Sequence, residues 1–357
     1  MGRASRIGIW TLGAVLMVIV VLGAGVLIAG NTAGGRVLLE RATARLSGGH
    51  VRLSGLSGAF PAAIDLGQLQ LSDAQGVWFT AERISLRWSP LALLARHLRV
   101  QRLQLERIDI ERRPVSQSSR QGNTRWPRID IDQLSIGALE LGPQLAGVRA
   151  TLSIQGTAHL RSLADAAADI IARRTDVQGD YRIKLRCDAD RVDATLSLEE
   201  PAGGTLGSLL QLPDLGALSV AASLNGPRNA ERLEATARAG QLRALVQGRL
   251  DLARGDADLV YRLEAAAMAP RADLSWQRVE LQGRWQGTVT APRAEARLRI
   301  DRLHAPGGGA VTQLSTSLTA DGGDLAVHAA AEGVVLPGPQ PRLLAETPVR
   351  VDATMRM

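Results

Sequence analysis

Apolar and polar residues alternate along most of this chain, which is the period-two pattern of a β-strand with one apolar and one solvated face. In the longest run, an apolar residue or a glycine occupies every second position from Leu242 to Leu252. Similar runs recur about every 12–20 residues from Tyr181 onward. Turns such as Asn225-Gly226-Pro227 and Asp321-Gly322-Gly323 separate them. The pattern predicts a mainly β protein with a long, repetitive sheet of antiparallel neighbours.

Three short stretches depart from the alternation and predict helices. The first covers residues 35–47, where Leu38, Ala42 and Leu46 share one helical face. The second covers residues 91–97 and follows Ser89-Pro90, because serine is a good N-cap and proline suits the first helical position. The third covers residues 159–174, where four apolar residues have helical spacing: Leu160, Leu163, Ala167 and Ile170.

The alternation also changes phase within residues 98–113. Leu103 and Leu105 share one phase, whereas Ile108 and Ile110 share the other. A β-bulge or a turn near Glu106-Arg107 would reconcile the two phases, so we predict an interruption there.

The N-terminal segment has the composition of a membrane anchor. Ile7 to Ala29 form 23 residues without a charge, and a helix of this length, about 34 Å, can cross a hydrocarbon core of about 30 Å. A cleaved signal peptide would have a shorter apolar region and a cleavage site. Arg3 and Arg6 predict a cytoplasmic N-terminus. The apolar residues expected to contact lipid are Ile7, Trp10, Leu12, Leu16, Val20, Leu22, Leu27 and Ala29.

These signals divide the chain into three parts. Residues 1–30 are a cytoplasmic tip and transmembrane anchor, residues 31–115 an N-terminal region, and residues 116–357 a repetitive β-region. The polar stretch 116–124 predicts a loop. The last segment, 349–357, alternates without a closing turn, and open sheet edges are usually protected. We therefore expect the β-region to continue beyond residue 357.

A long sheet with one apolar face must cover that face. A second sheet would give a closed sandwich, whereas a sheet curled into an open trough would leave an apolar lining for a ligand, and the alternation fits both. An acyl chain of about 16 carbons would suit the trough, because its burial is worth about 13 kcal/mol. The lining residues of such a groove would be Leu242, Val246, Leu250, Leu252, Leu259, Tyr261, Leu263, Leu281, Trp285 and Val289.

Composition argues against several other functions. The net charge is +7, but the arginines are interleaved with acids and only 3% of residues are aromatic, so we expect no nucleic-acid partner. Cys187 is the only cysteine, and the five histidines have no metal-ligand spacing. Asp188, Asp190 and Asp193 lack the glycine and glutamate of a calcium loop. No hydrolase or phosphate-loop motif is present, so we expect no enzyme activity, cofactor or metal.

A block of motifs in the N-terminal region carries a family resemblance. It contains Gly58-Ala59-Phe60-Pro61, then Leu69-Gln70-Leu71-Ser72-Asp73, and then Leu86-Arg87-Trp88-Ser89-Pro90-Leu91-Ala92-Leu93-Leu94. Later, Leu281-Gln282-Gly283-Arg284-Trp285-Gln286-Gly287-Thr288 is followed by Ala291-Pro292. This order resembles the N-terminal portion of the TamB family, the inner-membrane subunits of the translocation and assembly module, within the AsmA-like, bridge-like lipid transfer group.

The resemblance implies a β-taco, an open U-shaped groove lined with apolar residues. It also implies a single-pass inner-membrane protein whose bulk lies in the periplasm and moves phospholipid between the two membranes. The alternative within the same resemblance is a scaffold for outer-membrane protein insertion or secretion. Such a scaffold works with a barrel partner of the TamA type, which the family contacts through a C-terminal region that this sequence lacks.

Overall fold

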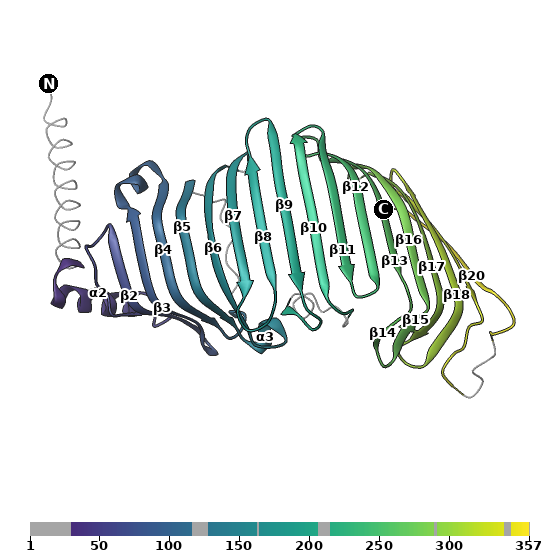
Figure 1. Cartoon of the computed structure of the whole chain (residues 1–357), viewed down its shortest axis with the longest axis horizontal. Helices are drawn as coiled ribbons and strands as arrows, with labels where there is room; N and C mark the ends of the chain where they lie inside the picture. The colour runs from purple at the N-terminus through teal and green to yellow at the C-terminus, as the bar shows by residue number, and fades with distance from the viewer. Residues whose placement is uncertain are drawn as a thin grey trace, which may run out of the picture. The chain divides into compact units, whose positions relative to one another are not determined.

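The computed structural model describes residues 30–115, 128–162, 164–205, 215–288, 291–338 and 344–356. The eight predicted anchor residues lie outside these ranges, and within them no helix is long and apolar enough to span a membrane. The described chain forms two compact units, which divide at residue 145, with Arg149–His159 belonging to the first unit. Figure 1 shows strands lying side by side within each unit.

The first unit is a ladder of strands with a helix at its start. In ladder order its paired strands are β1 (Val51–Ser54), β2 (Ala63–Asp73), β3 (Gly76–Ser89), β4 (His97–Ile110) and β5 (Arg128–Leu141). The pairs are antiparallel except β4 and β5, which run parallel. A parallel pair needs a long connection. β4 lies before the predicted boundary at residues 115–116 and β5 lies after it, and both strands belong to the first unit.

The core of the first unit lies where the alternation changes phase. Ala81, Ile84 and Ile108 are buried there. The predicted interruption of β4 is wrong, because Glu82 and Ile84 pair with Arg107 and Leu105 in unbroken register. The neighbouring strand β3 changes phase at the same level as β4. In β3, Arg83 has a φ of 48° and lies between the buried residues Ala81 and Ile84.

β5 follows the same phase change. Ile136 and Leu139 both pack against the core, and Gly137 lies between them. A Cβ atom at Gly137 would lie 2.8 Å from the carbonyl oxygen of Glu106. The absence of that atom lets β5 approach β4 closely, so the strands bend together and the ladder is not interrupted.

Two of the three predicted helices are present. The first is α2 (Ala33–Leu46), whose N-cap Thr32 accepts a hydrogen bond from the Gly35 N–H. The second is η1 (Pro90–Ala95), a 3₁₀ helix that ends at Arg96 in the left-handed conformation. The very short α3 (Pro143–Ala146) and the strand β6 (Ala150–Ser162) lie at the division between the units.

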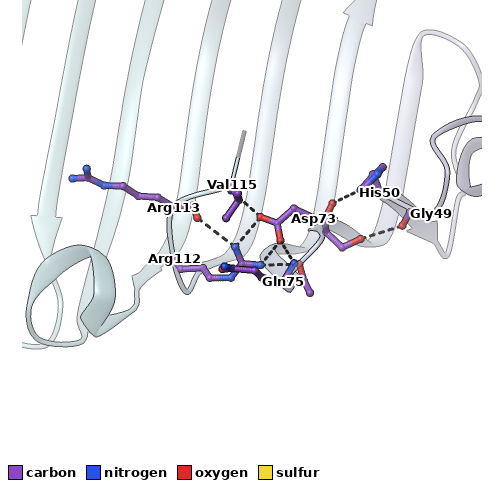
Figure 2. A network of polar contacts seen from close by, with 9 residues as sticks. Gly49, His50, Asp73, Gln75, Arg112, Arg113 and Val115 are labelled. Carbon is purple, nitrogen blue, oxygen red and sulfur yellow. Dashed lines mark hydrogen bonds and ion pairs between the residues drawn. The ribbon is translucent and has the colours of Figure 1, made fainter. Parts of the chain in front are cut away.

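A polar network fastens the end of β4 to the β2–β3 turn (Figure 2). Arg112 donates to both carboxylate oxygens of Asp73, one of them at 2.7 Å, and to the carbonyl oxygen of Gly76 at 3.0 Å. The N–H groups of Val115 and Gln75 also donate to Asp73. The hydrogen bond from Arg112 is the largest of several contacts that hold the pKa of Asp73 well below its usual range.

The second unit is a longer ladder. In ladder order its described strands are β7 (Asp165–Arg174), β8 (Asp180–Cys187), β9 (Arg191–Glu200), β10 (Leu218–Pro227), β11 (Glu231–Ala239), β12 (Leu242–Asp251), β13 (Asp256–Ala265), β16 (Arg278–Thr288), β17 (Pro292–Ala305), β18 (Gly309–Asp321), β19 (Asp324–Glu332) and β20 (Val349–Arg356). All these pairs are antiparallel, as predicted. A small hairpin of β14 (Met268–Arg271) and β15 (Leu274–Trp276) projects between β13 and β16.

The predicted helix at residues 159–174 is wrong. The end of β6 and the whole of β7 occupy this stretch, and β7 pairs with β8 from Ala166–Cys187 to Arg173–Asp180. Apolar residues also alternate here, with Ile170 opposite Ile183. Pairing with the next strand along the chain therefore overrides the helical spacing and the helix propensity of the alanines.

Candidate functional site

The register of the second unit aligns apolar residues into rows that cross every strand of its ladder. Opposite residues of an antiparallel pair project from the same face. The central row consists of Ile170, Ile183, Leu196, Ala222, Ala235, Val246, Tyr261, Gly283, Ala296, Leu318, Val327 and Ala353.

The rows on either side of the central row are equally free of charge. One runs from Ala172 on β7 to Val351 on β20, and the other from Ala168 to Met355. We call these three rows the apolar face. It contains no charged residue in any of the twelve strands that the structure describes in this unit.

The structure places most of the predicted lining residues together. On the apolar face lie Val246, Leu259, Tyr261, Leu263, Leu281 and Trp285. Leu242 and Leu250 lie in the next rows outward, opposite Ala239 and Glu231. Leu252 lies apart from them, because β12 ends at Asp251 and Leu252 belongs to the following turn. Val289 lies outside the described residues.

The apolar face is only partly covered. In β12 and β13 the apolar-face side chains are half-buried, whereas their charged neighbours on the other face are exposed. Residues in a packed core lose nearly all contact with solvent. In this unit the described strands make their extensive contacts with ladder neighbours, not with a second layer.

The two aromatic side chains of the predicted lining lie flat along the sheet. A Cβ atom at Gly283 would lie 2.4 Å from the Tyr261 hydroxyl oxygen, so the tyrosine ring crosses the glycine of the neighbouring strand. Its hydroxyl reaches the Glu295 carbonyl oxygen at 3.5 Å. The Trp285 indole N–H reaches the Gly287 carbonyl oxygen at 3.4 Å. Both side chains therefore lie close to backbone atoms of the sheet.

One margin of the apolar face carries a buried polar cluster that the alternation did not reveal. The Tyr181 hydroxyl donates to the buried carboxylate of Glu200. Buried Arg174 donates to Asp176 at 2.7 and 3.0 Å. Burial and then the bond to Glu200 raise the pKa of Tyr181, so its phenol stays protonated as the donor.

The opposite margin contains a second buried acid. Glu231 is 0% exposed and lies opposite Leu250. Its Oε2 accepts a hydrogen bond from the Leu252 N–H at 3.2 Å, while Oε1 has no partner among the described residues. The two acids thus bound the apolar face at either end of its strands.

The opposite, polar face carries alternating charges and a hollow of about 670 Å³. The hollow crosses β13 and β16 to β20. Most of its lining residues, Arg350 and Asp352 among them, have the phase of the polar face, and apolar-face positions such as Leu263 and Leu281 contribute between them. Cross-strand ion pairs such as Arg284–Asp258, at 2.9 Å, pattern this face. The hydrogen bond from Arg284 lowers the pKa of Asp258.

The first unit brings together two histidines that are far apart in the sequence. His97 on β4 and His159 on β6 both contact the carboxylate of Asp130 on β5, the latter at 3.1 Å. Burial alone would raise the pKa of Asp130, but the histidine hydrogen bonds outweigh it and the pKa is lowered. The cluster joins three strands. Among the described residues no group of three or more metal-ligating side chains is arranged to hold an ion.

The acidic residues at the β8–β9 turn have a local structural role. The Asp188 carboxylate accepts from the N–H groups of Asp190 and Arg191 at 2.9 and 2.7 Å. These two backbone bonds lower the pKa of Asp188. An aspartate that closes its own turn in this way is common in hairpins.

Comparisons of the whole chain with protein-family models, with curated proteins and with solved structures found no match. The resemblance to the TamB family therefore remains an interpretation of the sequence motifs.

Proposed function

We propose that this protein is an inner-membrane-anchored periplasmic conduit that moves phospholipid between the inner and outer membranes along the apolar face of its second unit. The single observation that carries the proposal is the register. Three uncharged rows continue without interruption from β7 to β20. Their side chains are half-buried in β12 and β13 and exposed at Val351 and Met355 on β20. The sequence contributes the expected anchor at residues 7–29 and the TamB-like motifs.

The chemistry of the face suits acyl chains. Leucine, valine and alanine supply apolar surface without directional bonds, so a chain can bind and slide with little preference for any one position. Each CH₂ that leaves water is worth about 0.8 kcal/mol. The Tyr261 ring lies over Gly283 of β16, which is opposite Ala296 of β17, so the large ring fills space that these small residues leave on the face. On this proposal the sheet curls into an open groove with this face inside.

Photocrosslinking tests the proposal with two neighbouring positions. A photoreactive residue at Leu263 lies on the apolar face, and one at Arg262 lies on the polar face of the same strand. We expect mass spectrometry to find phospholipid attached at position 263 but not at 262, when the full chain is irradiated in cells. Equal labelling at both positions, or no lipid at either in a folded protein, would contradict the conduit.

A second candidate function is a scaffold for outer-membrane proteins, and the edge strand β20 favours it. Among the described residues β20 pairs with β19, and in this reading its second edge pairs with an incoming strand. The partner in this reading is a barrel protein of the TamA type or its client. Replacing Thr354 by proline should remove this activity and leave lipid crosslinking at position 263 intact.

A further inference from the structure

The helix α2 has an outward face that the packing of the first unit leaves exposed. Leu38, Ala42 and Leu46 occupy one stripe of the helix, and the two leucines are 63% and 89% exposed. The sequence predicted this stripe as the apolar side of an amphipathic helix. Such a side normally packs against the protein, but here it faces away from it.

The opposite side of α2 is bonded to the connection between β1 and β2. The Glu40 carboxylate accepts from the Leu56 N–H at 2.8 Å. Arg36 donates to the carbonyl oxygens of Gly30 and Gly58 at 2.8 and 2.9 Å. These bonds fix which side of the helix points outward.

The exposed stripe is flanked by positive charge. Arg41 and Arg45 lie on the outward side, at helical positions adjacent to the two leucines. The only acid of the helix, Glu40, is engaged on the inward side. Leucines between arginines match an anionic lipid surface, because the leucines enter the acyl boundary while the arginines reach the phosphates.

The position of α2 in the chain identifies the surface that it meets. Only Gly30 to Thr32 separate the predicted anchor from the helix, and residues this few cannot span more than about 14 Å. Asn31 is itself held by two bonds to the backbone of Phe60 at 2.8 and 3.1 Å. If residues 7–29 span the bilayer, the start of α2 must lie at its surface.

We propose that α2 lies in the headgroup region of an anionic phospholipid bilayer, with Leu38, Ala42 and Leu46 inserted and Arg41 and Arg45 at the lipid phosphates. This inference rests on the membrane anchoring in the proposed function. It adds a second attachment that sets the orientation of the first unit on the membrane, which a single flexible tether would leave free.

The test uses the full chain in vesicles of phosphatidylethanolamine and phosphatidylglycerol. With Cys187 replaced by alanine, an environment-sensitive fluorophore is attached to Leu38→Cys or Leu46→Cys. The control is Arg254→Cys, whose side chain is 80% exposed in a turn of the second unit. We expect spin-labelled lipid to quench positions 38 and 46 and to leave position 254 unaffected. The pair Arg41→Gln and Arg45→Gln should weaken docking about fivefold per arginine.

Each outcome decides the inference. Water-exposed labels at 38 and 46 in a chain that floats with the vesicles overturn the docking of α2 and leave the anchor intact. A chain that does not float overturns both. If the labels at positions 38 and 46 are shielded from water, and this shielding disappears when the protein is diluted among more vesicles, contact between two copies replaces the proposal.

Discussion

Replacing Val246 by aspartate tests whether the apolar face is open. Val246 lies in the central row, between Ala235 and Tyr261, and is half-buried. Full burial of a valine side chain is worth about 1.5–3 kcal/mol. Partial burial therefore puts the loss at about 1–2 kcal/mol. The lower strand preference of aspartate adds up to about 1 kcal/mol. We expect the free energy of unfolding to fall by about 1–3 kcal/mol, with the carboxylate still hydrated.

The neighbouring position provides a matched control. Leu245 lies on the same strand, is 39% exposed and projects from the polar face. Leu245→Asp should lower the free energy of unfolding by about 1 kcal/mol, mainly through strand preference. Urea unfolding of both variants, followed by tryptophan fluorescence, gives the comparison. Phospholipid crosslinking at position 263 should fall in the Val246 variant and persist in the Leu245 variant.

A closed core would give a different result. A carboxylate enclosed there without a partner adds several kcal/mol to the cost. A Val246→Asp protein that fails to fold while Leu245→Asp folds would therefore refute the open face. Equal lipid crosslinking in two folded variants would refute the route along the central row.

Three further predictions concern contacts that hold the ladders together. Gly283→Val should destabilise the second unit by about 1–3 kcal/mol, because its side chain would meet both the Glu295 carbonyl oxygen and the Tyr261 ring; Gly283→Val in a Tyr261→Ala background, compared by urea unfolding, should regain only the part of the loss that the ring causes. Asp73 has a lowered pKa, so its contribution to stability is present above about pH 4 and is lost as the pH falls; thermal unfolding of Asp73→Asn should lack this acid-dependent component, and an unchanged pH profile would count against the network. Tyr181 has a raised pKa, so its contribution is present at neutral pH and is lost as the pH rises above about 10; Tyr181→Phe should cost about 1–3 kcal/mol at neutral pH and flatten the alkaline limb, whereas an unaltered limb would show that Glu200 needs no phenol donor.

The local pattern predicted much of the secondary structure. The alternation from Leu242 to Leu250 is β12, the stripe of Leu38 and Leu46 is α2, and η1 begins at Pro90 directly after Ser89. These features depend on the rotation per residue along the backbone and on the preference of a few residues for helix starts. Both are written in neighbouring positions of the chain.

Other features depend on which distant segments meet. Residues 159–174 have helical spacing, yet positions 166–173 pair with β8 as a strand. Leu105 and Ile108 change phase without a bulge, because β3 and β5 change phase beside them. His97 and His159 meet at Asp130 through the pairing of separate strands, and Glu231 loses all contact with solvent in the same way.

The alternation alone determined that each strand has one apolar side and one solvated side. Only the tertiary structure decided that twelve such sides share one register, that they form uncharged rows, and that the outward leucines of α2 stay exposed. The physical reason is that side-chain direction is a local property of the backbone, whereas register and burial depend on hydrogen bonds and contacts between residues distant in sequence.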